Sequence, residues 1–585
     1  MRCFVAIFVA TLLVVAVVAE DRVTLENDFS LRTSTGEWTA VRRATRHDRI
    51  SLRVVFKKSA EALDHLERRF WEVSDPRHSE YGRFLSKDEI TNIVKVSPTT
   101  IAAFKQWLQQ VAREDIGFSV GANKDTMTIT MAATDANVAF GTDMHVYQHN
   151  VAQDFIVRAS SHYSIPSQFS DKIDVVGNLL QFPAVWTLLS ESEPSTKKTA
   201  AMPPVGDTWP DDCGKCSSGL FGKRVTPDVL TSRYHLGAVP NGTAVGSIAV
   251  AEFTQVYWDQ QDLDLYAADC HLKNFSIIMH GSNKPKQCFV SIIIRPNLCK
   301  EALLDIETIK GVVGTIPLHN FYTDQYSILD WAENLSALEE EDLPMVQSVS
   351  YGNDEAQQSS VAYMDSVNVE FQKLGLRGVS ILFASGDGGV YGRDGSGKRF
   401  HPGFPATSPY ATSVGGTNFV HPGTIGDETA WGGSGGGFSD TFGVPEYQSE
   451  AVKTYKTEAA ATLPDASKWN QTGRGFPDVA ALGGQHNPYC ITLAKGATGA
   501  YGTSAATPTM ASIIAKLNEI RYKNKKSPLG FLNPFLYQNA NAFNDVTTGN
   551  NGGPQGQKGG FYAAKGWDPL TGLGTPDFEK LAQLV

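Results

Sequence analysis

The sequence predicts an α/β fold built on an open parallel sheet with helices on its faces, preceded by a smaller α+β unit. Short runs rich in apolar and β-branched residues have the length of buried parallel strands. Between two of them, apolar residues recur about every 3.6 positions, as on the buried face of a helix. A strand, a helix and a strand in this order indicate a parallel sheet, whose functional residues lie at the carboxyl ends of the strands. The predicted strands are residues 248–253, 345–349, 379–384 and 411–414, and the predicted helix is residues 360–374.

The length of the chain and its changes of composition predict more than one folded unit. The chain has 585 residues, and residues 1–19 combine Arg2 with an apolar run and a terminal small residue, which is typical of a signal peptide. Residues 20–195 begin with mixed strand and helix patterns, at 50–56 and 60–72. A Ser-, Pro- and Lys-rich stretch follows, where we expect an exposed and cleavable linker. Residues 196–585 form the predicted larger domain, and no later apolar run is long enough to span a membrane.

Charge and cysteine content limit the possible partners and compartments. The formal net charge is −11, which argues against nucleic acid or an anionic membrane as a partner. One of the seven cysteines lies in the predicted signal peptide, and the even remainder suits an oxidising compartment. Cys213 and Cys216 form a CxxC motif that is either part of a disulfide framework or half of a zinc or redox motif. We favour disulfides because no second CxxC follows, and the pairing stays open. Glycosylation sequons, which also point to the secretory pathway, lie at Asn241, Asn274, Asn334 and Asn470.

Ser504 is the candidate nucleophile. It lies in Gly502-Thr-Ser-Ala-Ala-Thr-Pro508, ahead of helical spacing over residues 510–520. At a loop-to-helix junction the unpaired N–H groups of the first turn can stabilise a developing oxyanion. We expect Pro508 in that first turn, where a missing N–H costs little. The alternative is that Ser504 only caps the helix.

The candidate general base is a carboxylate, because the His-Gly-Thr-His motif of subtilisin-type enzymes is absent. Glu301 and Asp305 lie four residues apart in a helical pattern over residues 300–310 and therefore share one face. Repulsion between them raises the pKa of one and couples their titration. The alternative is a solvated helix face. Asp387, among glycines at the carboxyl end of a predicted strand, is either a turn residue or a third acid of the site.

Together these motifs resemble the sedolisins, or serine-carboxyl peptidases. They follow the order of that family over about residues 225–585, and residues 20–195 resemble its propeptide. The resemblance implies a subtilisin-like parallel sheet and an acid-acting peptidase made as a zymogen, with polypeptide or oligopeptide substrates and its own propeptide as inhibitor. The matching segments are Glu301-x-x-Leu-Asp305, Ser348-Val-Ser-Tyr-Gly352, Ala384-Ser-Gly-Asp387, Phe404-Pro-Ala-Thr-Ser-Pro409, Val414-Gly-Gly-Thr417, Gly475-Phe-Pro-Asp478, Gly502-Thr-Ser504 and Pro528-Leu-Gly-Phe-Leu-Asn-Pro534.

The resemblance also implies a role for each residue. Ser504 would be the nucleophile, Glu301 the general base and later acid, Asp305 the acid that orients Glu301, and Asp387 a donor in the oxyanion hole. A carboxyl donates a hydrogen bond only while protonated, so activity should fall as pH rises. A glutamate base near its reference pKa suits acidic pH as well. The expected location is the secretory pathway, with a lysosome, an acidic vacuole or the extracellular space as destination.

One structural Ca²⁺ is implied near the C-terminus. The carboxylates of Asp545 and Asp568 would bind it, together with the carbonyls of Val546, Ala564 and Gly566, as hard oxygen ligands suit this ion. The alternative is that these segments are ordinary loops. Ala564 replaces a glycine of the resembled loop, which a carbonyl ligand should tolerate. Tyr501 replaces a small residue before Gly502 and should reshape a neighbouring subsite.

Several functions remain open from the sequence. The resemblance favours a tripeptidyl-peptidase, which removes tripeptides from free amino termini, over an enzyme that cuts internally. How the end of the cleft is closed decides between them, and the sequence does not show that wall. A subtilisin-type enzyme with a histidine base and an inactive secreted binding protein are the further alternatives.

Overall fold

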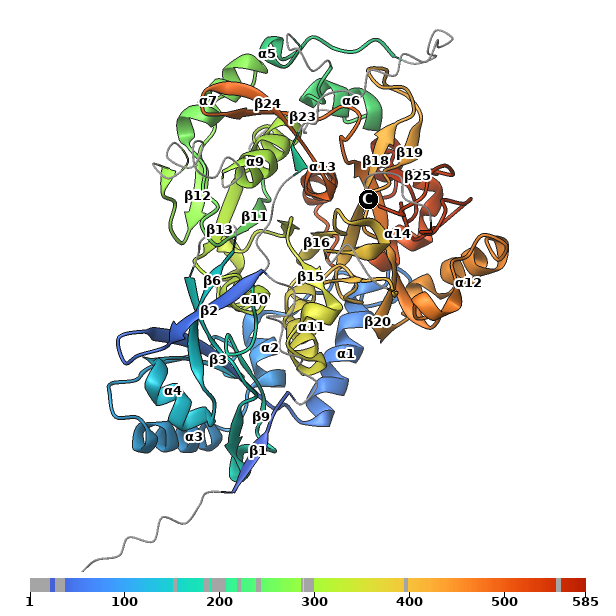
Figure 1. The fold of residues 1–585 in the computed structure, drawn as a ribbon. Coiled ribbons are helices and arrows are strands. Elements are labelled where there is room, and N and C mark those ends of the chain that lie inside the picture. Colours follow the sequence, from blue (N-terminus) through green and yellow to red (C-terminus); the bar gives the residue numbers. More distant parts are fainter. Residues whose placement is uncertain are drawn as a thin grey trace, which may run out of the picture.

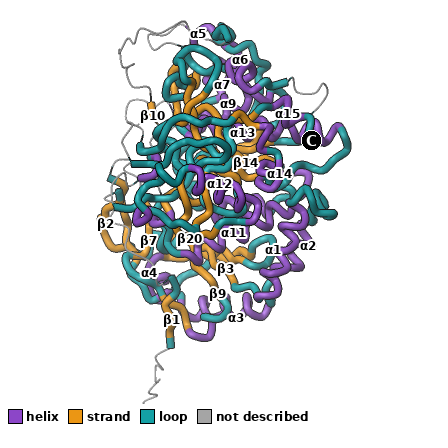
Figure 2. Tube along the Cα trace, turned by 90° about the vertical axis from the view of Figure 1, so that its right-hand side faces the viewer, coloured by secondary structure: helices purple, strands orange, loops and turns teal. Residues whose placement is uncertain are grey.

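The computed structural model describes residues 21–26, 37–150, 155–183, 189–190, 207–217, 223–237, 244–285, 288, 299–393, 398–553 and 559–585. The predicted signal peptide and the predicted cleavage point near residue 195 lie outside the described residues. A smaller N-terminal unit lies below a larger domain in Figure 1 and in the side view of Figure 2.

The larger domain is built on an eight-stranded sheet whose strands are almost all parallel. The predicted strands are confirmed, with small shifts at their ends. Only β19 (Glu428–Ala430) is antiparallel, at its contact with β18 (Thr412–Phe419), and β22 (Val479–Leu482) runs parallel to β18. The other strands, in spatial order up to β18, are β12 (Ile277–His280), β13 (Leu318–Thr323), β11 (Ile248–Phe253), β14 (Val346–Val349) and β16 (Ser380–Ala384).

Helices cover both faces of this sheet. Alternate residues of β11 point to opposite sides: Ile248 and Val250 join one hydrophobic core, and Ala249 and Ala251 join another. The first core contains residues of α9 (Lys300–Val313) and α13 (Thr503–Lys523). The second contains residues of α10 (Ile328–Ser336) and α11 (Val361–Leu376), the latter being the predicted helix.

The N-terminal unit is an α+β unit with its own core. It packs against the α10 and α11 side of the larger domain, because Val55 and Val175 join the core that these helices form, and Phe70 contacts Phe531. Its four-stranded antiparallel sheet has the order β4 (Gly117–Val120), β5 (Thr126–Ala132), β3 (Arg49–Phe56) and β9 (Ile173–Gly177). Its other elements are α1 (Ala60–Ser74), α2 (Lys87–Val94), α3 (Pro98–Val111), α4 (Ala133–Phe140), β1 (Arg22–Thr24), β2 (Trp38–Arg43), β6 (Met144–His149), β7 (Phe155–Ala159) and β8 (Ser164–Pro166).

A short strand from the predicted propeptide lies on the larger domain. β10 (Leu189–Ser190) pairs antiparallel with β24 (Gly496–Tyr501), with Leu189 opposite Tyr501. The other edge of β24 pairs with β23 (Tyr489–Leu493). Since β24 runs directly into Gly502 and Ser504, the propeptide strand lies next to the segment that carries the candidate nucleophile.

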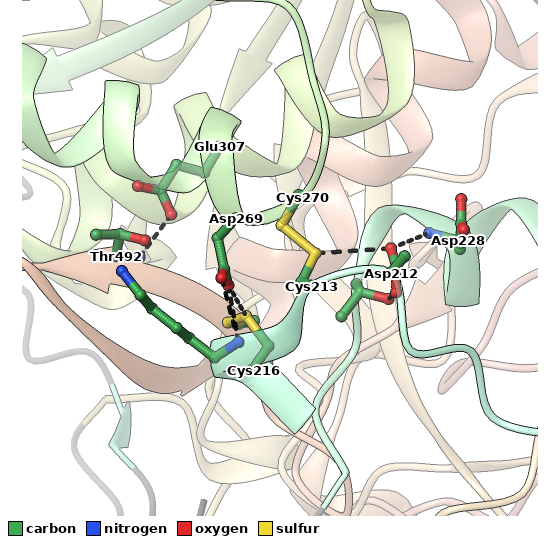
Figure 3. Close-up of a disulfide and its surroundings, with 11 residues drawn as sticks. Asp212, Cys213, Cys216, Asp228, Asp269, Cys270, Glu307 and Thr492 are labelled. Atoms are coloured by element: carbon green, nitrogen blue, oxygen red, sulfur yellow. Dashed lines mark hydrogen bonds between the residues drawn. A yellow bond between two sulfur atoms is a disulfide. The ribbon is translucent and has the colours of Figure 1, made fainter. Parts of the chain in front are cut away.

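The cysteines of the larger domain form three disulfides: Cys213–Cys270, Cys216–Cys490 and Cys288–Cys299. The disulfide role predicted for the CxxC motif is confirmed, although its two cysteines bond to distant partners and not to each other. Figure 3 shows Cys213 joined to Cys270, with Asp212 and Asp269 beside them. These bonds fix α5 (Gly214–Ser217) to the end of α7 (Gln260–Asp269) and to β23.

The remaining elements lie around the sheet, and none of the described helices is long and apolar enough to cross a membrane. They are α6 (Pro227–Tyr234), β15 (Asn353–Asp354), β17 (Gly403–Phe404), β20 (Gly437–Gly443), α12 (Ser449–Glu458), β21 (Gly473–Phe476), α14 (Asn533–Gln538), β25 (Phe543–Asn544), β26 (Thr575–Pro576) and α15 (Phe578–Ala582).

Candidate active site

The predicted site residues lie at the carboxyl ends of the central strands and at two helix starts. Asp387 follows β16, and Ser504 and Glu301 are the second residues of α13 and α9. Ser504 is 1% exposed and Glu301 is 3% exposed. The Ser504 hydroxyl is close enough to the Glu301 carboxyl to lower its pKa. The fold therefore brings the candidate nucleophile and the candidate base together.

The prediction that Pro508 lies in the first turn of its helix was wrong, because Pro508 lies deeper in α13. The helix begins at Thr503, so that Pro508 is an interior residue of α13. Proline has no N–H, and the Ser504 carbonyl therefore lacks the partner that an ordinary residue four positions later would supply. The Ser350 hydroxyl lies 3.4 Å from that carbonyl and 3.0 Å from Asp305 Oδ1. Ser350, which follows β14, thus links the helix of the nucleophile to the acid pair formed by Glu301 and Asp305.

Glu301 and Asp305 are buried, so the alternative of a solvated helix face is wrong. Among the described residues, neither carboxylate oxygen of Glu301 has a hydrogen-bond partner of good geometry, and Asp305 Oδ2 has none. Burial raises the pKa of Glu301 above its usual value, although the hydroxyls of Ser504 and Ser350 partly offset this. Burial, followed by the charges of Glu301 and Glu252, raises the pKa of Asp305 well above its usual value. The pair therefore holds protons far more strongly than free carboxyls do.

Glu252 is a third buried acid that we did not predict from the sequence. It lies near the end of β11 and accepts a hydrogen bond of 2.7 Å from the Tyr351 hydroxyl. Its pKa is raised, first by burial and then by Glu301. The signal in the sequence was a single acid inside an otherwise apolar predicted strand, which costs free energy unless the acid is used or neutralised.

Asp387 is bonded to the residue before the nucleophile. Its Oδ1 accepts hydrogen bonds from the Thr503 N–H at 2.7 Å and from the Thr503 hydroxyl at 2.9 Å. Loss of hydration raises the pKa of Asp387, and the two bonds from Thr503 partly offset this. Gly502 has a φ of +147°, and a Cβ there would come within 2.8 Å of Asp387 Oδ2. Glycine at 502 therefore permits the close approach of Asp387 to the start of α13.

Two histidines of the sheet make contacts with each other. His280 Nε2 and His319 Nδ1, on β12 and β13, are 2.9 Å apart. Burial lowers the pKa of His319 to about 4. The group that the structure places next to the Ser504 hydroxyl is the Glu301 carboxyl.

The predicted calcium ligands lie together in two C-terminal loops. Asp545 Oδ2 accepts a 2.8 Å bond from the Gly566 N–H, and Asp568 accepts bonds from the N–H groups of Ala564, Leu570 and Thr571. Burial raises the pKa of Asp568 to about 7. Within the described residues, no hydrogen bond reaches the predicted carbonyl ligands. Two carboxylates and free carbonyls form an all-oxygen donor set that fits Ca²⁺.

Comparisons with known proteins cover nearly the whole chain. Residues 36–182 match the family model "Pro-kumamolisin, activation domain", and residues 319–552 match "Subtilase family". The chain is 34% identical over 567 residues to tripeptidyl-peptidase 1 of Rattus norvegicus, covering 94% of this chain and 93% of the relative. It is 32% identical over 573 residues to tripeptidyl-peptidase 1 of Homo sapiens, covering 95% and 94%.

A solved structure has the same fold as the larger domain. This is Pseudomonas sedolisin, a serine-carboxyl proteinase complexed with two molecules of pseudo-iodotyrostatin. It has 22% sequence identity and a TM-score of 0.50, and the match covers 62% of this chain and 98% of sedolisin. This similarity and the two family models together confirm the predicted subtilisin-like sheet preceded by an activation unit.

Proposed function

Because the chain belongs to the sedolisin family of serine-carboxyl peptidases, we propose that it is the precursor of an acid-acting tripeptidyl-peptidase. The mature enzyme would release tripeptides from the free amino termini of polypeptides. The observation that carries this proposal is the meeting of Ser504, Glu301, Asp305 and Asp387 at one end of the sheet. The tripeptidyl specificity is supported by the names of the relatives that match along almost the whole chain.

The geometry supports an acyl-enzyme mechanism. Glu301 accepts the proton of Ser504 as Oγ attacks the peptide carbonyl, and Asp305, one turn later on the same face of α9, would orient Glu301. The Ser504 N–H and protonated Asp387 stabilise the oxyanion. Glu301 returns its proton to the leaving amine as the C–N bond breaks. Water then hydrolyses the ester by the same route, which regenerates Ser504.

The two C-terminal loops support a structural calcium site. Asp545, Asp568 and the carbonyls of Val546, Ala564 and Gly566 would hold the ion. Bound Ca²⁺ would neutralise the buried Asp568 and join the loop after β25 to the loop before β26.

The N-terminal unit is proposed to act as the enzyme's own inhibitor until acid weakens its contacts. The match to an activation domain and the pairing of β10 with β24 both support this. The predicted signal peptide, the three disulfides and the need for protonated Asp387 favour an acidic compartment of the secretory pathway, such as the lysosome.

Acidification of the purified precursor tests the proposal. Propeptide release is followed on a gel, and a tripeptide amide with a free amino group is assayed beside its acetylated analogue from about pH 3 to 7. Hydrolysis of the free substrate alone supports the tripeptidyl activity, and equal hydrolysis of both indicates an endopeptidase. The Ser504→Ala and Glu301→Gln variants should lose turnover. Full activity of Glu301→Gln would contradict the proposed base.

A further inference from the structure

Thr503 contacts Asp387 in a way that the proposed reaction does not by itself explain. The residue is 1% exposed and begins α13, directly before Ser504. Its N–H and its hydroxyl both donate to the same carboxyl oxygen, Oδ1. Its hydroxyl oxygen also accepts a bond of 3.1 Å from the Gly386 N–H. A chain of hydrogen bonds thus runs from Gly386 through the Thr503 hydroxyl to Asp387.

The direction of this chain is fixed by chemistry. A backbone N–H can only donate, so the Thr503 oxygen accepts from Gly386 and its own proton goes to Asp387 Oδ1. Oδ1 then accepts two hydrogen bonds, and a proton on Oδ1 would compete with both donors. When Asp387 is protonated, its proton must therefore be on Oδ2, the oxygen on the side of Gly502.

We infer that Thr503 is a positioning residue for the reaction: its hydroxyl fixes the proton of Asp387 on Oδ2, directed at the oxyanion. The inference rests on the proposed role of Asp387. It assigns to the Thr503 hydroxyl a function separate from that of its backbone N–H, which any residue at this position would keep. Orientation matters here because donors stabilise an oxyanion only when they are aimed before the reaction begins.

Thr503→Val tests this inference, because it removes the hydroxyl and keeps the shape and the N–H. We expect kcat to fall roughly tenfold with KM nearly unchanged, since the lost interaction acts in the transition state. The alkaline limb of the pH profile should move to higher pH, because the Thr503 hydroxyl lowers the pKa of Asp387. Thr503→Ser keeps the hydroxyl and should recover most of the rate.

Thr507→Val is the matched control. Thr507 is buried one turn later in α13, and its hydroxyl donates only to the Thr503 carbonyl at 2.8 Å. Its loss should leave the alkaline limb in place. If Thr503→Val does not fold, Thr503→Ala compared with Thr503→Ser gives the same comparison. A wild-type kcat together with an unmoved alkaline limb in Thr503→Val or Thr503→Ala would overturn the inference. A loss of kcat in Thr503→Ser as large as in the variant without the hydroxyl would also overturn it.

Asp387→Ala separates this inference from the proposed function. If Asp387→Ala is as active as the wild type, the proposed oxyanion role is wrong and the inference falls with it. If Asp387→Ala is inactive while Thr503→Val behaves like the wild type, the proposed function stands and the inference alone is wrong.

Discussion

The carboxyls of Glu252, Glu301 and Asp305 influence one another through their charges. Each is buried, and the charge of Glu301 raises the pKa values of the other two. Their protons are therefore lost in steps that belong to the group and not to single residues. The proposed reaction needs Glu301 deprotonated and Asp387 protonated at the same time. The expected pH profile is bell-shaped, with the group on the acid limb and Asp387 on the alkaline limb.

Glu252→Gln should move the acid limb of kcat/KM to lower pH. The repulsion between Glu252 and Glu301 is mutual, so the substitution removes a negative charge that raises the pKa of the base, Glu301. A carboxyl freed from a like charge loses its proton more easily, so the base becomes available at lower pH. A series of kcat/KM measurements between about pH 3 and 7 would show the shift.

Glu307→Gln is the control for this prediction. Glu307 is also fully buried on α9, but it accepts a bond from the Thr492 N–H and its neighbouring acid is Asp262. The Glu307→Gln variant should leave the acid limb of kcat/KM unmoved. An acid limb that stays in place in Glu252→Gln would show that Glu252 does not act on the acid pair.

The site residues differed in how well the sequence predicted them. Glu301, Asp305, Asp387 and Ser504 lie in short motifs with recognisable spacing, and the structure brings them together. Glu252 has no such motif, because it stands alone among the apolar residues of β11, with no second acid at a recognisable spacing. Its role depends on how β11 lies beside β14 and α9, which periodicity does not show.

At the scale of single elements, the start of α9 is held by a disulfide. Cys299 is the residue before the helix, and its bond to Cys288 lies two residues before Glu301. Closing so short a loop stabilises a protein by about 3 kcal/mol. The double variant Cys288→Ser with Cys299→Ser should lower both Tm and kcat, because the helix end that carries Glu301 loses its anchor.

Cys213→Ser with Cys270→Ser is the matched control. It also removes one disulfide from the larger domain, but this bond joins α5 to the end of α7. It should lower Tm and leave the kcat of the remaining folded enzyme close to that of the wild type. Equal effects of the two double variants on kcat would contradict a specific role of the Cys288–Cys299 bond.

Removal of calcium should destabilise the C-terminal loops. A ligand at about 100 times its Kd stabilises the folded state by about 2.7 kcal/mol, so chelation should lower Tm by several degrees. Because the donor set is large and made of oxygen, added Ca²⁺ should restore Tm, and the smaller Mg²⁺ should not. Asp545→Asn should remove the response to chelator. A Tm that chelator does not change would contradict the site.

The elements themselves were largely predictable. Buried parallel strands are apolar throughout, and α11 has a clear helical period, so both were found within a few residues. The start of α13 was not, because its first residues are small Thr, Ser and Ala residues followed by Pro508, and they carry no apolar period. The pairing of the cysteines depends on how α5, α7 and β23 meet in space, which spacing along the chain does not determine.

At the scale of the whole molecule, buried charges join the N-terminal unit to the larger domain. Asp125 Oδ2, in the loop before β5, lies 3.1 Å from both Lys58 and Lys373 Nζ. Lys373, on α11, also contacts Glu370 at 2.6 Å. Removing one partner of a buried ion pair costs about 3–5 kcal/mol, because it leaves the other charges uncompensated. Asp125→Asn should therefore lower the Tm of the precursor and let the propeptide leave at higher pH.

The pH dependence of this contact has a definite sign. The two lysines lower the pKa of Asp125 to about 2, despite its burial. A carboxyl with a lowered pKa stabilises the folded state above its unfolded pKa, and the effect is lost only as pH falls through the folded value. The contact of Asp125 with the two lysines thus persists between pH 7 and about 4. Release of the propeptide in this range must therefore depend on the protonation of other groups.

Asp143→Asn is the control for Asp125→Asn. Asp143 pairs with Arg43 inside the N-terminal unit, and both side chains are exposed, so the pair contributes little. Tm and the pH of half-conversion on a gel should match those of the wild type. An Asp125→Asn precursor that converts at the wild-type pH would show that the buried charges do not hold the two units together.

The propeptide strand β10 and an incoming peptide cannot both pair with the same residues of β24. β24 has two edges, and β23 occupies one of them. While Leu189 and Ser190 pair with Tyr501 and Ala500 on the other edge, an incoming peptide cannot bind the backbone groups of these two residues. Departure of β10 would therefore uncover the backbone groups of Ala500 and Tyr501, just ahead of Ser504. Release of the propeptide would therefore both free Ser504 and expose a strand edge to which a substrate peptide can bind.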